Sequence, residues 1–288
     1  MDMHKLKLFI SLASTGHFGK AAAQCHVSPS TMSRNLKQLE QELNTSLMER
    51  DNRSVALTDS GHRFLQFARE TLQQWETFQD SILADANTLR GQLSIYCSVT
   101  ASYSFLYEIL AEFRTRHPGI NIKLHTGDPA QAIERVTRGF EDIAIAARPA
   151  TLPAGLNFKA IASSPLRFIA PKDSSLLPVP KASHWQSLPM IISEEGLARE
   201  RFNQWCQQQG FTPNIYAEVK GNEAIVSMVS LGFGVGLVPH IVLENSPLQD
   251  RVRLLADQPD LGPFETGICV LDKRLKSPIV SALWAEIA

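Results

Sequence analysis

The stretch from residue 17 to residue 40 constrains the fold of this chain more than any other part of the sequence. Its pattern predicts one helix over residues 19–26, a tight turn, and a second helix over residues 29–43. Ser28, in the turn, is a favourable N-cap residue because its hydroxyl can accept a hydrogen bond from a free helix N–H. Pro29 suits the first helical position, where its missing N–H is not needed. We therefore predict two short helices joined by a turn.

Apolar residues at helical spacing indicate how these two helices pack. In the first helix, small side chains leave room for a crossing helix: Ala21, Ala22 and Ala23. In the second helix, one stripe predicts the buried face: Met32, Leu36, Leu39 and Leu43. An amphipathic helix is also predicted before them, with Leu6, Phe9, Ile10 and Ala13 on one face. Together these patterns indicate a small helical domain.

The open face of the second predicted helix carries hydroxyls and cations but no acid. Residues 3–39 contain no Asp or Glu, although the whole chain has a net charge of only −1. Such a local surface suits contact with phosphates, because each neutralised phosphate releases counterions. The charge alone is equally consistent with a helical bundle that has a solvated basic face, but the capped second helix favours DNA. The candidate DNA-binding residues are Phe18, Lys20, Ser28, Pro29, Ser30, Thr31, Ser33, Arg34, Lys37, Arg50 and Arg53.

This segment resembles the helix-turn-helix of LysR-type transcriptional regulators. Within the two helices, the resemblance is carried by the Ala pair, Val27-Ser28, Ser33-Arg34 and Leu39-Glu40. It continues in residues 47–50 and in residues 55–61, and the latter resemble the strand of a wing that leads into a linker helix. Asn44 and Met48 depart from the family pattern, but Asn tolerates a left-handed helix end and Met fills a core. The resemblance implies double-stranded DNA as a partner, a homodimer that assembles into a homotetramer, and contact with RNA polymerase.

Residues 49–53 are predicted to form the tip of the wing, between two short strands. Arg50 and Arg53 are placed there to touch the DNA backbone or the minor groove. For Arg50, a structural ion pair is the alternative. Thr58 is predicted to cap a long helix that extends to about residue 87.

The long helix carries a heptad pattern: Leu65, Ala68, Leu72, Trp75, Gln79, Ile82, Ala86 and Leu89. A helix of this length cannot bury such a stripe against the small N-terminal domain alone, so a second copy is the natural partner. We therefore predict a dimerising coiled coil. The alternative is packing against the effector domain of its own chain.

Length and composition indicate a globular protein of two or three compact units. The chain has 288 residues, of which 44% are hydrophobic and 20% charged. It has no apolar run long enough for a membrane span and no apolar signal core at the N-terminus, so we expect it in the cytoplasm. The four cysteines show no CxxC pair or metal-like cluster, and we predict no metal or cofactor.

From residue 90 the pattern alternates between strands and helices, with a helix predicted over residues 101–116 and a strand near residues 166–170, which indicates a parallel α/β sheet. The resemblance implies a two-lobed effector domain like that of periplasmic binding proteins. The predicted fold class is thus a multidomain α/β protein with an N-terminal winged helix-turn-helix, a long linker helix and a two-lobed α/β effector domain. We place these parts at residues 1–58, 59–89 and 90–288. Lobe one would comprise residues 90–160 and 268–288, and lobe two residues 161–267.

In open α/β sheets, ligands bind at the carboxyl ends of strands. The first such end brings Ser98, Thr100 and Ser102 to the start of a helix, where free N–H groups favour an anion. We predict a cleft between the lobes for a small-molecule carboxylate inducer. Its candidate lining residues come from these and later strand or helix ends: Ser98, Thr100, Ser102, Thr126, Arg148, Ser193, Asn222 and its neighbour Glu223. The alternatives are plain helix caps for the three hydroxyls and a surface ion pair for Arg148.

Further runs narrow the resemblance within the family: CSVTASYSFL, IKLHTGD, GNEAIVSMVSLGFGVGLVP, VLENSP and PFETGICVLDKR. They resemble members that activate the gene for acetohydroxy acid isomeroreductase, in isoleucine and valine synthesis. This resemblance implies acetolactate and acetohydroxybutyrate as inducers, together with repression of the regulator's own gene. A LysR-type regulator of another small carboxylate is one alternative. A second is an enzyme or solute binder tethered to a DNA-binding domain, but the sequence has no Walker A, GxSxG or HExxH motif.

Overall fold

The computed structural model describes residues 2–51, 54–84, 89–173, 175, 177, 182–256 and 258–287. Side chains are not described for residues 50, 51, 54, 80, 81, 83, 84 and 182–184. The chain divides into two compact units: Met1–Leu83 with Arg138–Phe140, and Ala84–Thr137 with Glu141–Ala288. Each unit is considered by itself below. The boundaries that we placed at residues 58/59 and 89/90 remain predictions.

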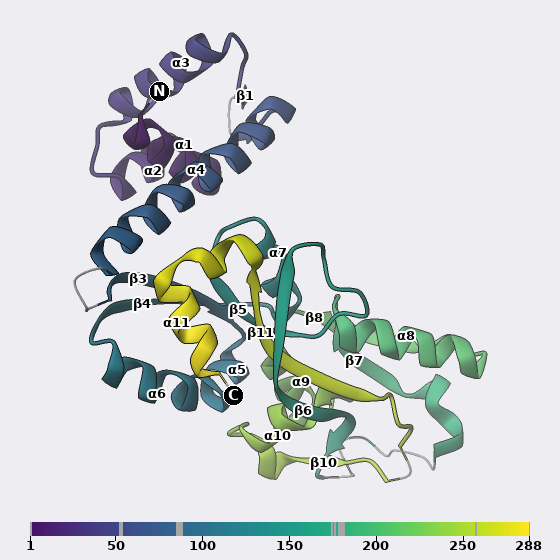
Figure 1. Cartoon of the computed structure of the whole chain (residues 1–288). Coiled ribbons are helices and arrows are strands. Elements are labelled where there is room, and N and C mark those ends of the chain that lie inside the picture. Colours follow the sequence, from purple (N-terminus) through teal and green to yellow (C-terminus); the bar gives the residue numbers. More distant parts are fainter. Residues whose placement is uncertain are drawn as a thin grey trace. The chain divides into compact units, whose positions relative to one another are not determined.

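The first unit contains four helices and a two-stranded ribbon within the described residues, coloured purple to blue in Figure 1. Its elements are α1 (Met3–Thr15), α2 (Phe18–Gln24), α3 (Pro29–Leu43), β1 (Met48–Asp51), β2 (Ser54–Leu57) and α4 (Asp59–Ala84). Strands β1 and β2 pair antiparallel, as expected for a wing. The predicted helix-turn-helix is confirmed, although α2 begins at Phe18 because the His17 ring caps it by accepting hydrogen bonds from the N–H groups of Gly19 and Lys20.

Most of the predicted core of the first unit is confirmed. Ala21, Ala22 and the first three members of the α3 stripe are buried. Leu43 is the exception, since 41% of it is exposed: α3 ends there, and Asn44 turns the chain away in the left-handed conformation that we predicted. Ala23 is also exposed. The helix start predicted at Thr58 is confirmed, because its hydroxyl accepts a hydrogen bond from Gly61 N–H at 2.9 Å.

The heptad stripe of α4 divides into two parts. Leu65, Ala68 and Leu72 are buried in the first unit itself, within a core that also holds the edge-on ring pair Phe9 and Phe64, 4.9 Å apart. The prediction that these three residues form a dimer seam is therefore wrong, because they pack with α1 and the other helices in the core of the first unit. Elsewhere on α4, several large apolar side chains remain exposed: Phe67, Trp75, Phe78 and Ile82. Ala86 of the predicted seam lies outside the described residues.

The second unit alternates strands and helices, as the sequence pattern predicted. Its first part contains β3 (Arg90–Cys97), α5 (Val99–Ser104), α6 (Leu106–Arg116), β4 (Gly119–Thr126), α7 (Ala132–Thr137) and β5 (Ile143–Ala147). Its second part contains β6 (Leu156–Pro171), β7 (Pro189–Ser193), α8 (Leu197–Gln209), β8 (Asn214–Val219), α9 (Asn222–Ser230), β9 (Val235–Pro239), α10 (His240–Glu244) and β10 (Val252–Leu254). The chain then returns through β11 (Pro263–Leu271) to α11 (Pro278–Glu286).

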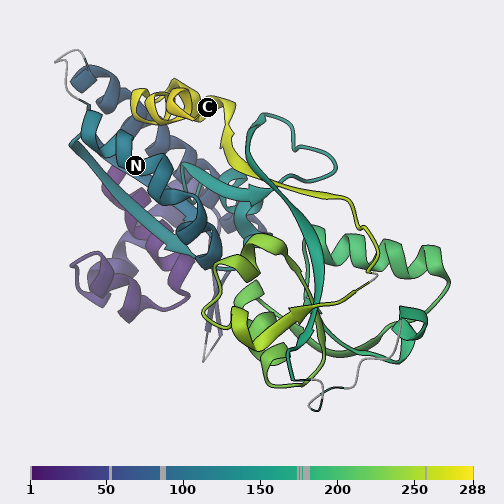
Figure 2. The same cartoon turned by 90° about the horizontal axis from the view of Figure 1, so that it is seen from below.

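Two long antiparallel strands, β6 and β11, run side by side through this unit, and Figure 2 shows them in teal and yellow. The strand order in the described residues is β4-β3-β5-β11-β6-β9-β7-β8, with β10 paired to β6. Strands β3, β4 and β5 are parallel to one another in lobe one, and β7, β8 and β9 are parallel in lobe two. The two lobes therefore share the β6–β11 pair.

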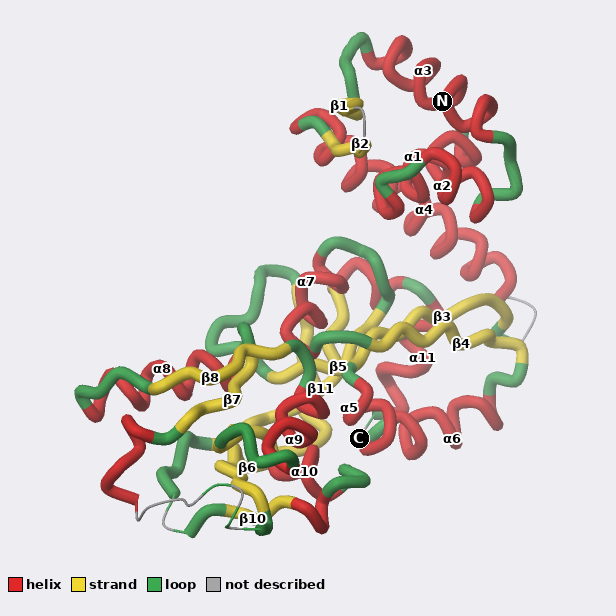
Figure 3. Tube along the Cα trace, turned by 180° about the vertical axis from the view of Figure 1, so that it is seen from behind, coloured by secondary structure: helices red, strands yellow, loops and turns green. Residues whose placement is uncertain are grey.

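Helices cover both faces of each lobe's part of the sheet (Figure 3). In lobe one, α6 and α11 pack against one face, through Phe113, Ile279 and Leu283, whereas α7 covers the other face. In lobe two, α8 packs on one face and α9 with α10 on the other. Each sheet is thus buried on both sides, which explains apolar runs such as residues 143–147.

Two local predictions for this unit were wrong, and one short strand was missed. The predicted helix over residues 101–116 is two helices, α5 and α6, because the backbone at Phe105 departs from helical geometry. Strand β6 begins at Leu156, ten residues before the strand that we predicted at residue 166. Strand β10 was not predicted, since three residues are too few to show a period.

Three of the four cysteines, Cys97, Cys206 and Cys269, are buried, and Cys25 is partly buried. Burial raises the pKa of the Cys97 and Cys206 thiols to about 11 and that of Cys269 to about 12. Among the residues that the structure describes, no three His, Cys, Asp or Glu side chains gather as metal ligands would. None of the described helices is long and apolar enough to cross a membrane.

Candidate functional site

Helix α3 begins with a compact group of hydroxyls. The Ser28 side chain accepts a hydrogen bond from Thr31 N–H at 3.1 Å, as predicted for an N-cap. The Ser28 Oγ also lies 2.8 Å from the hydroxyl oxygens of both Ser30 and Thr31. Ser28, Pro29 and Ser30 are exposed, while Thr31 and Ser33 are half-buried. The start of the helix therefore presents linked hydroxyls, which suit phosphate or base edges.

Three cations are exposed around these hydroxyls: Lys20 on α2, and Arg34 and Lys37 on α3. Within the described part of the chain, no carboxylate lies within ion-pair distance of any of the three. Lys5 behaves differently, because its Nζ lies 2.7 Å from Glu42 Oε1 and its side chain is only 16% exposed. Its hydrogen bond lowers the pKa of Glu42. The open basic face is thus formed by Lys20, Arg34 and Lys37.

Three other predicted DNA contacts, Phe18, Arg50 and Arg53, do not belong to this exposed basic face in the described structure. Phe18 packs against the core of the first unit while remaining partly exposed. Arg50 lies in β1, but its side chain is not described, and Arg53 lies outside the described residues. The predictions for the two wing arginines therefore stay predictions.

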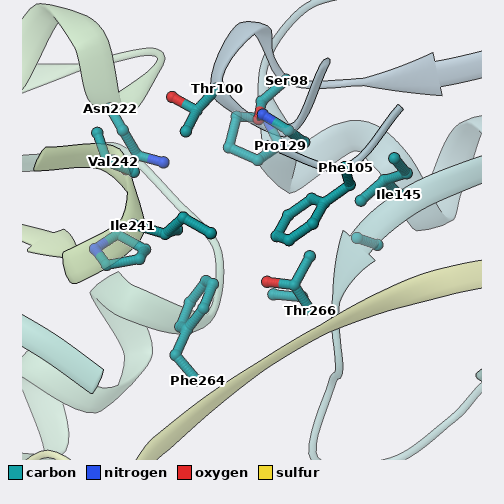
Figure 4. Close-up of a pocket in the computed structure, with 14 residues that line it drawn as sticks. Ser98, Thr100, Phe105, Pro129, Ile145, Asn222, Ile241, Val242, Phe264 and Thr266 are labelled. Carbon is teal, nitrogen blue, oxygen red and sulfur yellow. The ribbon is translucent and has the colours of Figure 1, made fainter. Parts of the chain in front are cut away.

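The second candidate site is a pocket at the carboxyl ends of β3 and β5, between the two lobes. Figure 4 shows it closed by Asn222, Ile241 and Val242 from lobe two, facing Ser98 and Thr100 from lobe one. Its full lining is Ser98, Thr100, Ala101, Phe105, Pro129, Ile145, Ala146, Ala147, Asn222, Pro239, Ile241, Val242, Phe264 and Thr266. The cavity measures about 50 Å³, which is room for about three or four water molecules.

The hydroxyls at the start of α5 are already engaged. Ser98 caps the helix by accepting a hydrogen bond from Ala101 N–H at 3.1 Å, and Ser102 donates to the Val99 carbonyl at 2.6 Å. Thr100 donates its backbone N–H to Glu223 Oε1 at 2.8 Å and its hydroxyl to the same oxygen. Glu223 comes from α9 of lobe two. A carboxylate of the protein itself therefore occupies the position where we predicted a ligand carboxylate.

The structure brings together only some of the predicted effector residues. Ser98, Thr100 and Asn222 line the pocket, whereas Ser102, Thr126 and Ser193 do not. Arg148 lies in a different cavity, of about 340 Å³, with Leu197, Glu200 and Arg201. Its guanidinium lies 3.2 Å from Glu265, so the surface ion pair that we kept as an alternative is present.

The apolar side of the pocket was missed at the sequence level. Phe264 and Thr266 come from β11, more than 160 residues after Thr100. Ile241 and Val242 follow Pro239 at the end of β9, and that strand end was the one available signal. A strand end points to the edge of a sheet, but it does not tell which returning strand will close the cavity.

Comparisons with known proteins identify the families of both parts of the chain. Residues 3–62 match the model of the bacterial regulatory helix-turn-helix proteins of the lysR family, and residues 86–288 match the LysR substrate binding domain. The HTH-type transcriptional activator IlvY of Haemophilus influenzae is 43% identical over 292 residues, covering 100% of both chains. The HTH-type transcriptional regulator IlvY of Escherichia coli K12 is 43% identical over 294 residues, covering 99% of this chain and 98% of that protein.

The fold is similar to the crystal structure of CbnR, a LysR family transcriptional regulator. The TM-score is 0.69 at 21% identity, covering 100% of this chain and 98% of that one. These matches confirm the predicted fold class and DNA-binding function, and they exclude the enzyme alternative. The chain belongs to the LysR family of DNA-binding transcriptional regulators.

Proposed function

We propose that this chain is the inducer-responsive activator of the gene for acetohydroxy acid isomeroreductase in isoleucine and valine synthesis, and that it also represses its own gene. The proposal is supported by 43% identity to the two IlvY proteins, which extends over both the DNA-binding and the effector regions. The runs that resemble these activators include residues 97–106 and 221–239, which contain Ser98, Thr100 and Asn222 of the pocket.

The inducers would be acetolactate and acetohydroxybutyrate, which are small branched hydroxy-keto carboxylates. The observation that carries this proposal is the mixed character of the interlobe pocket. The Thr100 N–H and hydroxyl and the Asn222 amide can donate to a carboxylate, and the Thr266 hydroxyl can bond a hydroxyl or ketone oxygen. Phe105, Ile145 and Phe264 offer apolar walls for short alkyl branches.

The pocket has room for about three or four water molecules, and its lining comes from both lobes. A ligand that replaces this water would therefore contact both lobes at once. A ligand shifts the arrangement of the lobes only as far as it binds one arrangement more tightly than the other. This differential binding is the route by which an inducer would change how the regulator holds DNA.

For DNA contact, we propose Lys20, Ser30, Arg34 and Lys37, on the exposed face of α2 and α3. Two copies would pair through the exposed apolar side chains of α4, namely Phe67, Trp75, Phe78 and Ile82. Pairing would place two recognition helices on two half-sites. We further propose a tetramer that bends DNA, with the inducer relaxing the bend and RNA polymerase contacting the activated complex.

The test of the effector site is Thr100→Val, with Thr126→Val as the matched control. Thr126 is an exposed residue at the end of β4 that does not line the pocket. We expect the Thr100 variant to bind operator DNA normally but to lose its transcriptional response to acetolactate, while the control keeps that response. A normal response in the Thr100 variant would contradict the site. If neither the wild type nor the two variants responded to acetolactate, but the wild type responded to another carboxylate, the inducer assignment would be contradicted.

A further inference from the structure

The short helix α5 of lobe one is hydrogen-bonded to lobe two at both of its ends. At its start, Thr100 donates two hydrogen bonds to Glu223 of α9. At its end, the Asn245 amide, just after α10, donates to the Ser104 hydroxyl at 2.9 Å. The sequence separations are 123 and 141 residues, so both contacts depend on the approach of the lobes rather than on local folding.

The two contacts differ in chemistry. The Asn245–Ser104 bond joins two neutral side chains outside the pocket lining. The Glu223 contact places a carboxylate on the N–H and hydroxyl of Thr100, a residue that is only 6% exposed and lines the cavity. Hydrogen bonds to a charged acceptor are the stronger kind. Glu223 therefore holds the donors that a carboxylate ligand would need.

We propose that Glu223 is a built-in competitor of the inducer, which holds lobe two against Thr100 of lobe one and must be displaced when a ligand carboxylate binds Thr100. This inference rests on the proposed function of the pocket as the inducer site. In the structure the Glu223 carboxylate bridges the two lobes by accepting both hydrogen bonds of Thr100. An incoming carboxylate takes over both donors, and Glu223, which is exposed at the surface, moves into water.

This replacement of the Glu223 carboxylate by a ligand carboxylate gives the pocket a preference for acids. A ligand with a carboxylate replaces the hydrogen bonds that Glu223 gives up. A neutral ligand that displaced Glu223 would offer the buried Thr100 donors only a neutral acceptor, which forms weaker hydrogen bonds than a carboxylate. The competitor also lowers the apparent affinity for the inducer, because only the fraction of molecules with Glu223 released is able to bind.

The experiment compares the full-length protein with three variants: Glu223→Ala, Glu223→Gln and Asn245→Ala. Asn245→Ala is the matched control, because it removes the other interlobe bond and leaves the Thr100 contact in place. Calorimetry measures binding of acetolactate and of acetoin, which keeps the hydroxy-ketone but lacks the carboxylate. Hydrogen exchange of a peptide that contains Thr100 is measured without any ligand.

We expect Glu223→Ala to bind acetolactate about tenfold more tightly than the wild type, with Glu223→Gln in between and Asn245→Ala close to the wild type. Acetoin should bind more weakly than acetolactate to every protein, because it lacks the carboxylate that replaces Glu223 on Thr100. Without ligand, exchange at Thr100 should be faster in Glu223→Ala only. Equal or weaker acetolactate binding by Glu223→Ala, or equal tightening by Asn245→Ala, would overturn the proposal.

Hydrogen exchange at Thr100, measured without ligand, tests this proposal independently of the inducer assignment. If acetolactate binds neither the wild type nor Glu223→Ala, the inducer assignment fails. Faster exchange at Thr100 in Glu223→Ala would then still support the closing contact. Unchanged exchange would overturn it.

Discussion

Replacing Lys37 by Met removes one exposed cation from the face that we propose for DNA. Lys37 lies on α3, and within the described residues no carboxylate is close enough to pair with it. Met has nearly the same helix propensity as Lys, so α3 should keep its stability. The change therefore alters charge on this face and little else.

The magnitude follows from the number of unpaired cations on this face. Each phosphate that is neutralised contributes a slope of about −0.9 to log K against log salt concentration. Lys20, Arg34 and Lys37 together would give about −2.7 for each DNA-binding unit. For each bound unit, loss of Lys37 should make the slope shallower by about 0.9 and weaken binding about fivefold at 0.15 M salt, or about fifteenfold at 0.05 M.

The assay is fluorescence anisotropy with operator DNA over a salt series, for the wild type, Lys37→Met and Lys5→Met. Lys5 is the matched control, because it is a lysine of the same unit whose charge is engaged by Glu42. We expect the slope to change in the Lys37 variant and not in the Lys5 variant. An unchanged slope in Lys37→Met, or the same change in both variants, would refute the assignment of this face.

Three further predictions concern stability and reactivity. In Gly61→Ala, the added Cβ would lie 2.0 Å from the Leu47 carbonyl oxygen, so urea unfolding should show a loss of about 3 kcal/mol, and an unchanged midpoint would contradict the packing. Arg135→Met removes the two hydrogen bonds, at 2.5 and 2.9 Å, that Arg135 donates to the Glu141 carboxylate, whose side chain is 1% exposed, and leaves it, within the described residues, only the contact with His125; we expect a loss of about 3 kcal/mol in the same assay, against little change for the exposed pair in Arg148→Met. At pH 8 a thiol reagent should modify only Cys25 quickly in the folded protein, because the raised pKa values of Cys97, Cys206 and Cys269 leave almost no thiolate; rapid modification of more than one thiol would contradict their burial.

The first unit was predictable because its signals are local. The Ser28 cap, Pro29 and the Met32–Leu36–Leu39 period all act within one or two helical turns, and the structure confirms each of them. The packing partner of Leu65 on α4 was not predictable from such local signals. The heptad period showed that one face of α4 is buried, but a period does not identify the partner, and α1 of the same chain covers that face.

The effector pocket was predictable only on one side. The rule that ligands meet strand ends led to Ser98, Thr100 and Asn222, which the structure places together. The same rule led to Arg148, which follows β5 but turns toward Glu265 instead. Phe264 and Thr266 arrive on a strand that returns from lobe two, and this long-range pairing leaves no local pattern.

The most direct test of the proposed function is a footprint of the purified protein on the promoter of the isomeroreductase gene, with and without acetolactate. We predict protection of two neighbouring sites and a change in the cleavage pattern between them when acetolactate is added. Protection that acetolactate does not alter would contradict the inducer assignment. Absence of binding to this promoter would contradict the proposed target gene.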